Sequence, residues 1–271
     1  MTKRSPDGTG QLHFDRVSLA TGVSLHYADG GTKGKTPIVF VHGFVDSYWS
    51  FMRVIEFLSP AYRTIALDLR GHGDSDKPET GYSIADFTQD LILFIDALGL
   101  GKAHLVGHSM GSFIAQSFAA IHPHRVEKLV LIGSAPCAVG NPVLLEIKPL
   151  IDALEDPLER DFVSGFQAIG NPVPAEFMEM IISETMKVPA RVWRSACAGL
   201  MQADLRPILH SVAAPTLIMW GNQDTIFMRR DQETLLSLIP DSRLKEFDAG
   251  HALHWEKPME AAAALESFIS G

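Results

Sequence analysis

A serine between two glycines is the first residue of this chain whose position suggests chemistry. In the stretch GHSMG, residues 107–111, a short apolar run typical of a buried strand meets a segment with helical periodicity. A sharp strand-to-helix turn needs small residues two positions before and after its tip, and it lifts the central side chain out of the sheet. The GxSxG pattern therefore predicts that Ser109 is a nucleophile.

A serine hydroxyl is a weak nucleophile unless a base lies beside it. In chains with this turn, an acid and then a histidine follow the serine in sequence. Asp224 and His251 come in that order, each directly after an expected strand. We expect His251 to take the proton of Ser109 and Asp224 to hold His251 in the required tautomer. This chemistry is acyl transfer, and it requires no metal and no cofactor.

Two backbone amides are candidates for stabilising the oxyanion. Met110 opens the helix after the turn, so its N–H points toward the reacting carbonyl. The stretch VHGFVDSYW follows the first parallel strand, and its His42-Gly43 pair turns the N–H of Phe44 inward.

Other polar residues near these motifs are better explained as structural. Asp248 is still close to its strand and is expected to accept hydrogen bonds within the loop, while His254 is a candidate wall of the pocket. His108 is next to Ser109, but neighbours in such a turn point in different directions. The loop 68–78 contains His72 between closely spaced glycines, and its polar side chains are expected to satisfy backbone groups.

The apolar pattern predicts an α/β fold with a doubly wound, mostly parallel sheet. Segments 12–19 and 23–29 alternate with period two and predict an antiparallel hairpin. Continuous apolar runs, typical of strands buried on both faces, occur at 37–42, 64–68, 103–107, 128–133 and 215–221, and a further strand is expected at 243–247. Helical segments alternate with them, most clearly at 83–98, where Ser83 and Asp86 form a capping box.

This alternation stops between residues 136 and 213, where helical pieces separated by prolines predict an inserted cap. We therefore divide the chain into a core, residues 1–135 and 214–271, and a helical cap, residues 136–213. Most apolar side chains of the cap are expected to form its own core. The candidates for the substrate pocket are Phe166, Met178, Trp193, Ile226 and His254.

Composition narrows the classes of function. The 271 residues are 46% hydrophobic and carry a net charge of −9, without a dense basic stripe, which disfavours nucleic acid as a partner. Cys137 and Cys197 form no CxxC pair and are expected to be free thiols. The first residues lack the apolar stretch of a signal peptide, and no apolar run is long enough to span a membrane. We expect a cytoplasmic protein, and the pattern indicates no oligomeric state.

Together these motifs resemble the α/β-hydrolase superfamily, over residues 23–270 and in the order typical of capped members. The chain looks most similar to bacterial carboxylesterases and lactone hydrolases. Ser109 argues against haloalkane dehalogenases and epoxide hydrolases, which carry aspartate at this turn. Ala252, which follows His251, argues against carbon–carbon hydrolases, which often have tryptophan there. Arg191 and Arg194 in the cap are candidates for binding a substrate carboxylate, although such arginines are more often solvated.

The resemblance implies a serine hydrolase that cleaves small-to-medium apolar or aryl esters, or lactones, through an acyl-enzyme. Its partner would be the small-molecule ester or lactone itself. Three alternatives use the same triad: a ligand receptor with slow hydrolysis, a carbon–carbon hydrolase or lyase, and a perhydrolase. Turnover number separates the receptor from an enzyme, because enzymes typically turn over ~1–10³ times per second.

Overall fold

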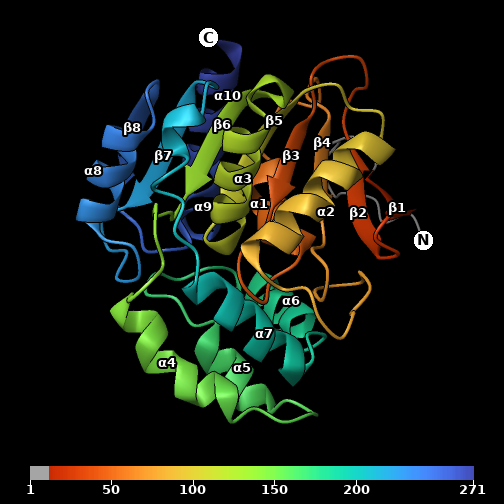
Figure 1. The fold of residues 1–271 in the computed structure, drawn as a ribbon, viewed down its shortest axis with the longest axis vertical. Helices are drawn as coiled ribbons and strands as arrows, with labels where there is room; N and C mark the ends of the chain where they lie inside the picture. Colours follow the sequence, from red (N-terminus) through yellow and green to blue (C-terminus); the bar gives the residue numbers. More distant parts are fainter. Residues whose placement is uncertain (1–11) are drawn as a thin grey trace.

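The computed structural model describes residues 12–271, and an eight-stranded sheet forms its centre (Figure 1). The polar sequence as far as Gly10 predicts a frayed start, but these residues lie outside the described part of the chain. The strands are β1 (His13–Ser18), β2 (Ser24–Gly30), β3 (Ile38–Val41), β4 (Thr64–Leu67), β5 (Ala103–His108), β6 (Val126–Ile132), β7 (Thr216–Gly221) and β8 (Ser242–Phe247).

The strand order is β1-β2-β4-β3-β5-β6-β7-β8. β1 and β2 form the predicted hairpin, and β2 also pairs antiparallel with β4. All other pairs are parallel. The predicted doubly wound, mostly parallel sheet is confirmed, and the carboxyl ends of β3, β5, β6 and β7 therefore lie at the same edge.

Both faces of the central strands are covered, which explains why their sequences read as continuous apolar runs. In β3, Ile38 and Phe40 pack in one core cluster, while Val39 and Val41 pack in the other. The helices outside the cap are α1 (Met52–Ile55), α2 (Ile84–Ala97), α3 (Met110–Ile121), α8 (Arg229–Leu238), α9 (Leu253–Glu256) and α10 (Pro258–Ser270). α2 and α3 contribute to the cluster that contains Val39 and Val41, and α1 and α10 contribute to the cluster that contains Ile38 and Phe40, so the chain forms three layers.

The N-terminus of α2 has the predicted cap. The Ser83 hydroxyl accepts the amide of Asp86, and the Asp86 carboxylate accepts the amide of Ser83. Three short 3-10 helices complete the described secondary structure: Tyr48–Phe51, Pro123–Arg125 and Leu209–Ser211.

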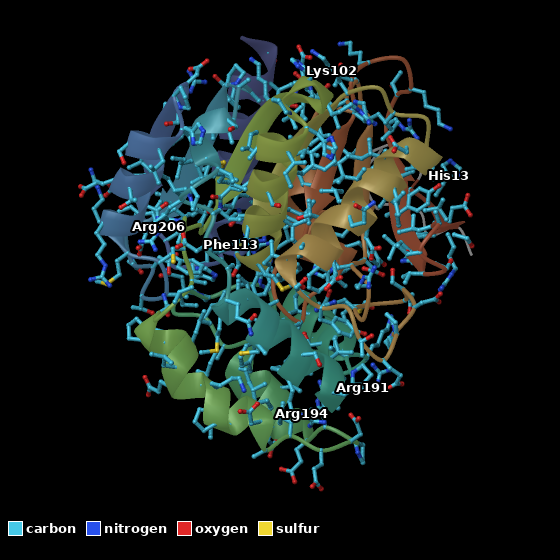
Figure 2. The ribbon with its side chains drawn as sticks, viewed as in Figure 1. His13, Lys102, Phe113, Arg191, Arg194 and Arg206 are labelled. Carbon is cyan, nitrogen blue, oxygen red and sulfur yellow. The ribbon has the colours of Figure 1, made fainter. Side chains whose placement is uncertain are left out.

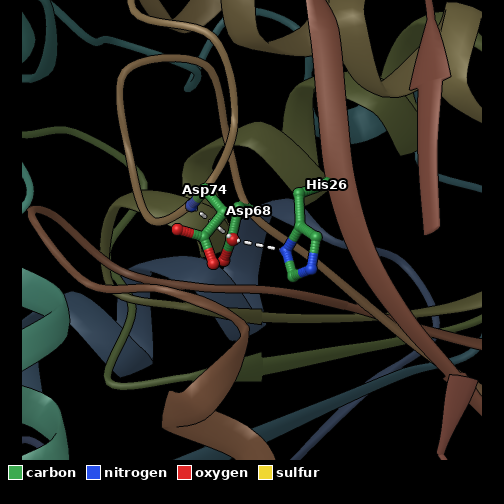
Figure 3. Close-up of side chains that lie close together, drawn as sticks. All are labelled: His26, Asp68 and Asp74. Carbon is green, nitrogen blue, oxygen red and sulfur yellow. Dashed lines mark hydrogen bonds and ion pairs between the residues drawn. The ribbon is translucent and has the colours of Figure 1, made fainter. Parts of the chain in front are cut away.

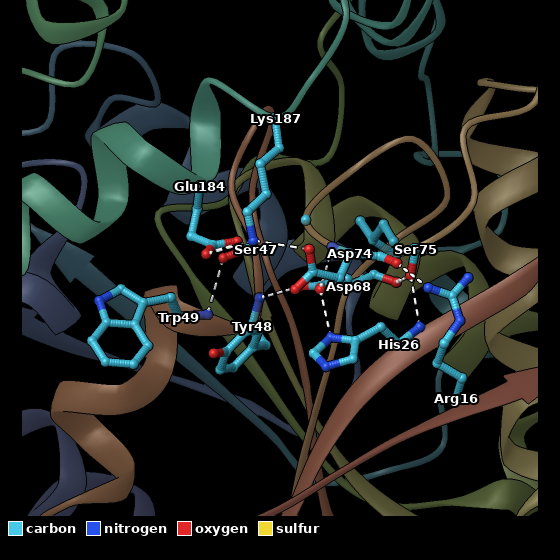
Figure 4. A network of polar contacts seen from close by, with 12 residues as sticks. Arg16, His26, Ser47, Tyr48, Trp49, Asp68, Asp74, Ser75, Glu184 and Lys187 are labelled. Carbon is cyan, nitrogen blue, oxygen red and sulfur yellow. Dashed lines mark hydrogen bonds and ion pairs between the residues drawn. The ribbon is translucent and has the colours of Figure 1, made fainter. Parts of the chain in front are cut away.

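Four helices form the cap between β6 and β7, within the predicted residues 136–213. They are α4 (Pro142–Asp152), α5 (Arg160–Phe166), α6 (Ala175–Thr185) and α7 (Ala190–Met201), and they gather at one end of the sheet (Figure 1). Lys187, between α6 and α7, pairs with Asp74 of the core at 2.9 Å (Figure 4). This contact ties one half of the cap to the loop after β4.

No helix within residues 12–271 has the length and apolar character that crossing a membrane would need. Cys137 and Cys197 are both free thiols, the first partly exposed and the second buried.

Candidate active site

The turn between β5 and α3 has the strained geometry that the GxSxG pattern predicts. Ser109 has φ 49° and ψ −120°. A Cβ atom at Gly107 would lie 2.4 Å from the carbonyl oxygen of Gly111, and one at Gly111 would lie 2.1 Å from the carbonyl oxygen of Val41. Neither position has room for a side chain, so the two glycines allow the turn to form against β3.

Asp224 and His251 meet beyond the carboxyl ends of β7 and β8. Nδ1 of His251 donates to Oδ2 of Asp224 at 2.8 Å, while Oδ1 of Asp224 accepts the amides of Ile226, at 2.8 Å, and Phe227, at 3.1 Å. Asp224 is buried, with 5% of its surface exposed. With the proton on Nδ1, Nε2 of His251 remains free to accept a proton, as a general base requires.

The loop after β3 is packed directly against Ser109. A Cβ atom at Gly43 would lie 2.9 Å from Nδ1 of His108 and 3.3 Å from Cβ of Ser109. His42 fixes the start of this loop, because its Nδ1 donates to the carbonyl of Gly43 at 2.8 Å and its Nε2 accepts the amide of Leu69 at 3.0 Å. Burial lowers the pKa of His42 to about 4, so the ring is neutral and this hydrogen-bond pattern is stable at neutral pH.

Backbone strain within residues 12–271 is concentrated at this site. Apart from glycines, only Val45 and Ser109 have a positive φ, 53° and 49°. Such conformations cost of order 1–3 kcal/mol each and persist only where surrounding contacts impose them. The two residues flank the space in which the Phe44 and Met110 amides are expected to bind an oxyanion.

A cavity of about 570 Å³ opens onto Ser109 and His251. Core loops form its floor, and α4 and α5 form its roof. Its apolar wall comprises Phe44, Val143, Leu144, Ile147, Leu150, Ile151, Phe162, Phe166, Ile169, Leu200, Ile226, Phe227 and Trp255. The volume suits one small-to-medium organic molecule.

Of the five residues predicted to form the pocket, Phe166 and Ile226 line this cavity. Trp193, Met178 and His254 do not. Trp193 is fully buried behind the wall, with its ring centroid 4.7 Å from that of Phe166. Met178 packs into core clusters, and His254 is buried with its Nε2 3.1 Å from Oγ of Ser50. Trp193 and Met178 pack within the cap and its contacts, while His254 lies in α9 of the core.

His108 also borders the cavity, and its ring packs against two other histidines. Its ring centroid lies 5.0 Å from that of His251 and 4.3 Å from that of His254. Both ring nitrogens are buried without a hydrogen-bond partner. Burial, together with the neighbouring histidines, holds its pKa well below the usual value, so the ring is neutral.

Two acidic residues that the motif analysis missed belong to this site. Asp46 lines the cavity with only 2% of its surface exposed. Glu256 accepts the amide of Gly250 at 2.9 Å, one residue before His251, and so fixes the loop that carries the base. Asp46 stands within the quoted stretch VHGFVDSYW, where an acid in an otherwise apolar loop was the available signal. Asp248, by contrast, is exposed and accepts from Nε2 of Gln223 at 2.8 Å.

One group of side chains within residues 12–271 has a composition that suits a metal ion: His26, Asp68 and Asp74 (Figure 3). Its atoms are already engaged. The Asp68 carboxylate accepts Nδ1–H of His26 and the amides of Tyr48 and Asp74 at 2.7–2.9 Å, and Asp74 pairs with Lys187. A cation would have to displace these contacts, so the cluster fits a structural support of the loop. His72 is buried in the same loop and donates from Nδ1 to the carbonyl of Arg70.

The two cap arginines considered for a substrate carboxylate, labelled in Figure 2, bind backbone carbonyls. Arg191 donates to the carbonyls of Pro78 and Lys77 at 2.6 and 2.5 Å, and Arg194 donates to the carbonyl of Leu154. Neither lines the cavity.

Comparison with known proteins gives the same picture. Residues 36–158 match the family model described as alpha/beta hydrolase fold. The chain is 27% identical to 3-oxoadipate enol-lactonase 2 of Acinetobacter baylyi, over 95% of this chain and 97% of that protein. It is 30% identical to a Bacillus subtilis protein provisionally assigned as 2-succinyl-6-hydroxy-2,4-cyclohexadiene-1-carboxylate synthase, over 94% of this chain and 97% of that protein.

Among solved structures, E-2-(acetamidomethylene)succinate hydrolase superposes with a TM-score of 0.84 at 26% identity, over 96% of this chain and all of that one. The matches to this structure and to the two curated relatives extend over nearly the whole length of each protein. The strained serine turn, the acid–histidine pair and the capped parallel sheet lie within the matched region. The chain belongs to the α/β-hydrolase family.

Proposed function

We propose that this protein is a serine hydrolase that cleaves carboxylic esters or lactones of small-to-medium apolar or aryl substrates. The observation that carries this proposal is the His251–Asp224 hydrogen bond of 2.8 Å, whose histidine faces the same cavity as Ser109. Nucleophile, base and orienting acid are the three groups that acyl transfer requires.

The reaction proceeds in two halves. Oγ of Ser109 attacks the carbonyl carbon while Nε2 of His251 takes its proton, and the amides of Phe44 and Met110 donate to the resulting oxyanion. His251 then protonates the leaving alcohol, and an acyl-enzyme forms on Ser109. A water activated by His251 releases the acid. Each oxyanion donor of this kind typically contributes ~10²–10³ in rate.

The cavity wall argues against anionic substrates. It is mainly aliphatic and aromatic, and no lysine or arginine of the described chain lines it. Three relatives bear the names of compounds with carboxylates: 3-oxoadipate, a cyclohexadiene carboxylate and a succinate. Arg191 and Arg194 bind backbone carbonyls, so residues 12–271 place no lysine or arginine in the cavity for such a group. This favours ester or lactone cleavage over the reaction of the carboxylate-named synthase.

The test is kcat/KM across p-nitrophenyl esters of increasing acyl length, with aryl esters, a lactone and a phosphate monoester alongside. Burying each methylene contributes about 0.8 kcal/mol, so the rate should rise up to about fourfold per methylene until the cavity is full. We expect butyryl or octanoyl esters to be best, palmitoyl esters poor and the phosphate inert. Ser109→Ala is the matched control. No turnover of any ester or lactone would contradict the proposal.

A further inference from the structure

One carboxyl group is buried in the wall of the cavity that Ser109 and His251 border. Asp46 lies two residues after Phe44, and only 2% of its surface is exposed. A second carboxylate, Asp161 of α5, lines the same cavity from an exposed position. The cavity therefore holds two acids and, over residues 12–271, neither lysine nor arginine.

Asp46 has no counter-charge in the protein. None of the ion pairs formed by residues 12–271 includes it; its hydrogen-bond partners are uncharged, the amide of Ser47 at 2.9 Å and the side chain of Ser50. Nearby acids, Asp68 and Glu184, add to the negative potential around it. The neighbouring cation, Lys187, is already paired with Glu184 and Asp74 at 2.9 Å (Figure 4).

Aromatic rings lie among the aliphatic side chains of the wall. Phe44, Phe162, Phe166 and Trp255 all line the cavity. The faces of such rings attract cations, most strongly where water is excluded. The His108 ring, also in the wall, is neutral and has two unpartnered nitrogens, so it supplies no positive charge. An unpaired carboxyl among aromatic rings is the combination that recognises an ammonium group.

We propose that Asp46 is a specificity-determining residue that makes the cavity prefer esters with an ammonium group at the end remote from the scissile bond. The same charge disfavours esters with a carboxylate there. Two residues of chain span at most ~7 Å, so Asp46 reaches groups a few bonds away from a carbonyl bound at the Phe44 amide. This inference rests on the proposed ester hydrolysis and names its substrate class.

The wild-type protein gives the first test, with two isosteric pairs at pH 8. On the alcohol side the pair is butyrylcholine and 3,3-dimethylbutyl butyrate. On the acyl side it is the p-nitrophenyl esters of 4-(trimethylammonio)butyric acid and 5,5-dimethylhexanoic acid. Dividing each kcat/KM by the rate of hydroxide hydrolysis removes intrinsic reactivity. We expect the ammonium member of one pair to be favoured at least about tenfold, and p-nitrophenyl hydrogen glutarate to be disfavoured about as much.

Asp46→Asn supplies the second test, because it removes the charge and keeps the shape. The ratio of the ammonium ester to its uncharged isostere should fall to about one. Asp161→Asn is the matched control and should change this ratio less than about twofold, because an exposed carboxylate is screened by solvent. The ratio is taken within each variant, so a general loss of activity does not affect it.

The outcomes separate the two proposals. Any one of three results overturns the role of Asp46. The ammonium-to-isostere ratio of kcat/KM is near or below one in both wild-type pairs, or this ratio is unchanged in Asp46→Asn. The third is that the glutarate ester is cleaved as fast as the dimethylhexanoate ester. Absence of hydrolysis of the uncharged esters instead overturns the proposed function. If Asp46→Asn does not fold, the test is inhibition of the wild type by choline and by its uncharged isostere 3,3-dimethylbutanol. Stronger inhibition by choline supports the inference, and equal inhibition contradicts it.

Discussion

Replacing Asp46 with asparagine should stabilise the fold, and the gain should grow as the pH rises. Burial raises the pKa of Asp46 from 3.8 to about 7; Asp68 and Glu184 add to this effect, and Ser50 and Ser47 offset part of it. Between these two pKa values the folded protein holds a proton that the unfolded chain has released. The free energy of unfolding therefore falls with rising pH on account of this group.

The size of the effect follows from the two pKa values. From about pH 5 to about pH 8, titration of Asp46 lowers the free energy of unfolding of the wild type by about 3 kcal/mol. Asparagine does not titrate, so Asp46→Asn should not show this decrease. Urea unfolding of both proteins at three pH values measures it, because the other groups titrate alike and cancel in the difference. The exposed Asp161→Asn serves as control and should give parallel curves. Parallel curves for Asp46→Asn would refute the argument that a buried, unpaired carboxyl titrates here.

Three further predictions concern the catalytic turn and the triad. A fluorophosphonate probe should label the wild type and leave Ser109→Ala unlabelled; labelling that persists would remove Ser109 from its role. Asp224→Asn should lose of order 10⁴ in kcat because His251 loses its tautomer-setting partner, whereas Asp248→Asn should lose only a few-fold, and the reverse order would move the acid to Asp248. Gly111→Ala should destabilise by several kcal/mol, since its methyl group would meet the Val41 carbonyl at 2.1 Å, and an unchanged urea midpoint would contradict the packing. Gly101→Ala, with open space around its Cβ, is the matched control.

The sequence is most informative where a residue type is dictated by its own backbone. Continuous apolar runs predict the parallel strands because both faces of the sheet are covered. Gly107 and Gly111 predict the turn because no side chain fits there. Asp224 and His251 are predictable from their places after strands, since the carboxyl ends of parallel strands share one edge of the sheet.

The cavity is less predictable because it depends on how the cap packs. Phe166 and Trp193 are both aromatic residues on cap helices, yet one lines the cavity and the other lies behind it. Periodicity identifies the buried face of a helix without distinguishing a core from a cavity wall. The side-chain directions of His108 and Asp46 likewise depend on contacts between the loops after β3 and β5, which no local pattern encodes.

The loop after β3 holds two features that cost stability in adjacent residues: the positive φ of Val45 and the unpaired carboxyl of Asp46. Both persist because the loop is fixed at its two ends, by His42 at the start and by Ser50, which bonds to Trp255 and His254, at the finish. Neither feature stabilises the fold, so stability does not explain the residues present. A buried charge at a substrate cavity is instead expected where function selects it. On this reasoning Asp46→Asn should make the protein more stable and less discriminating between charged and uncharged esters in one substitution.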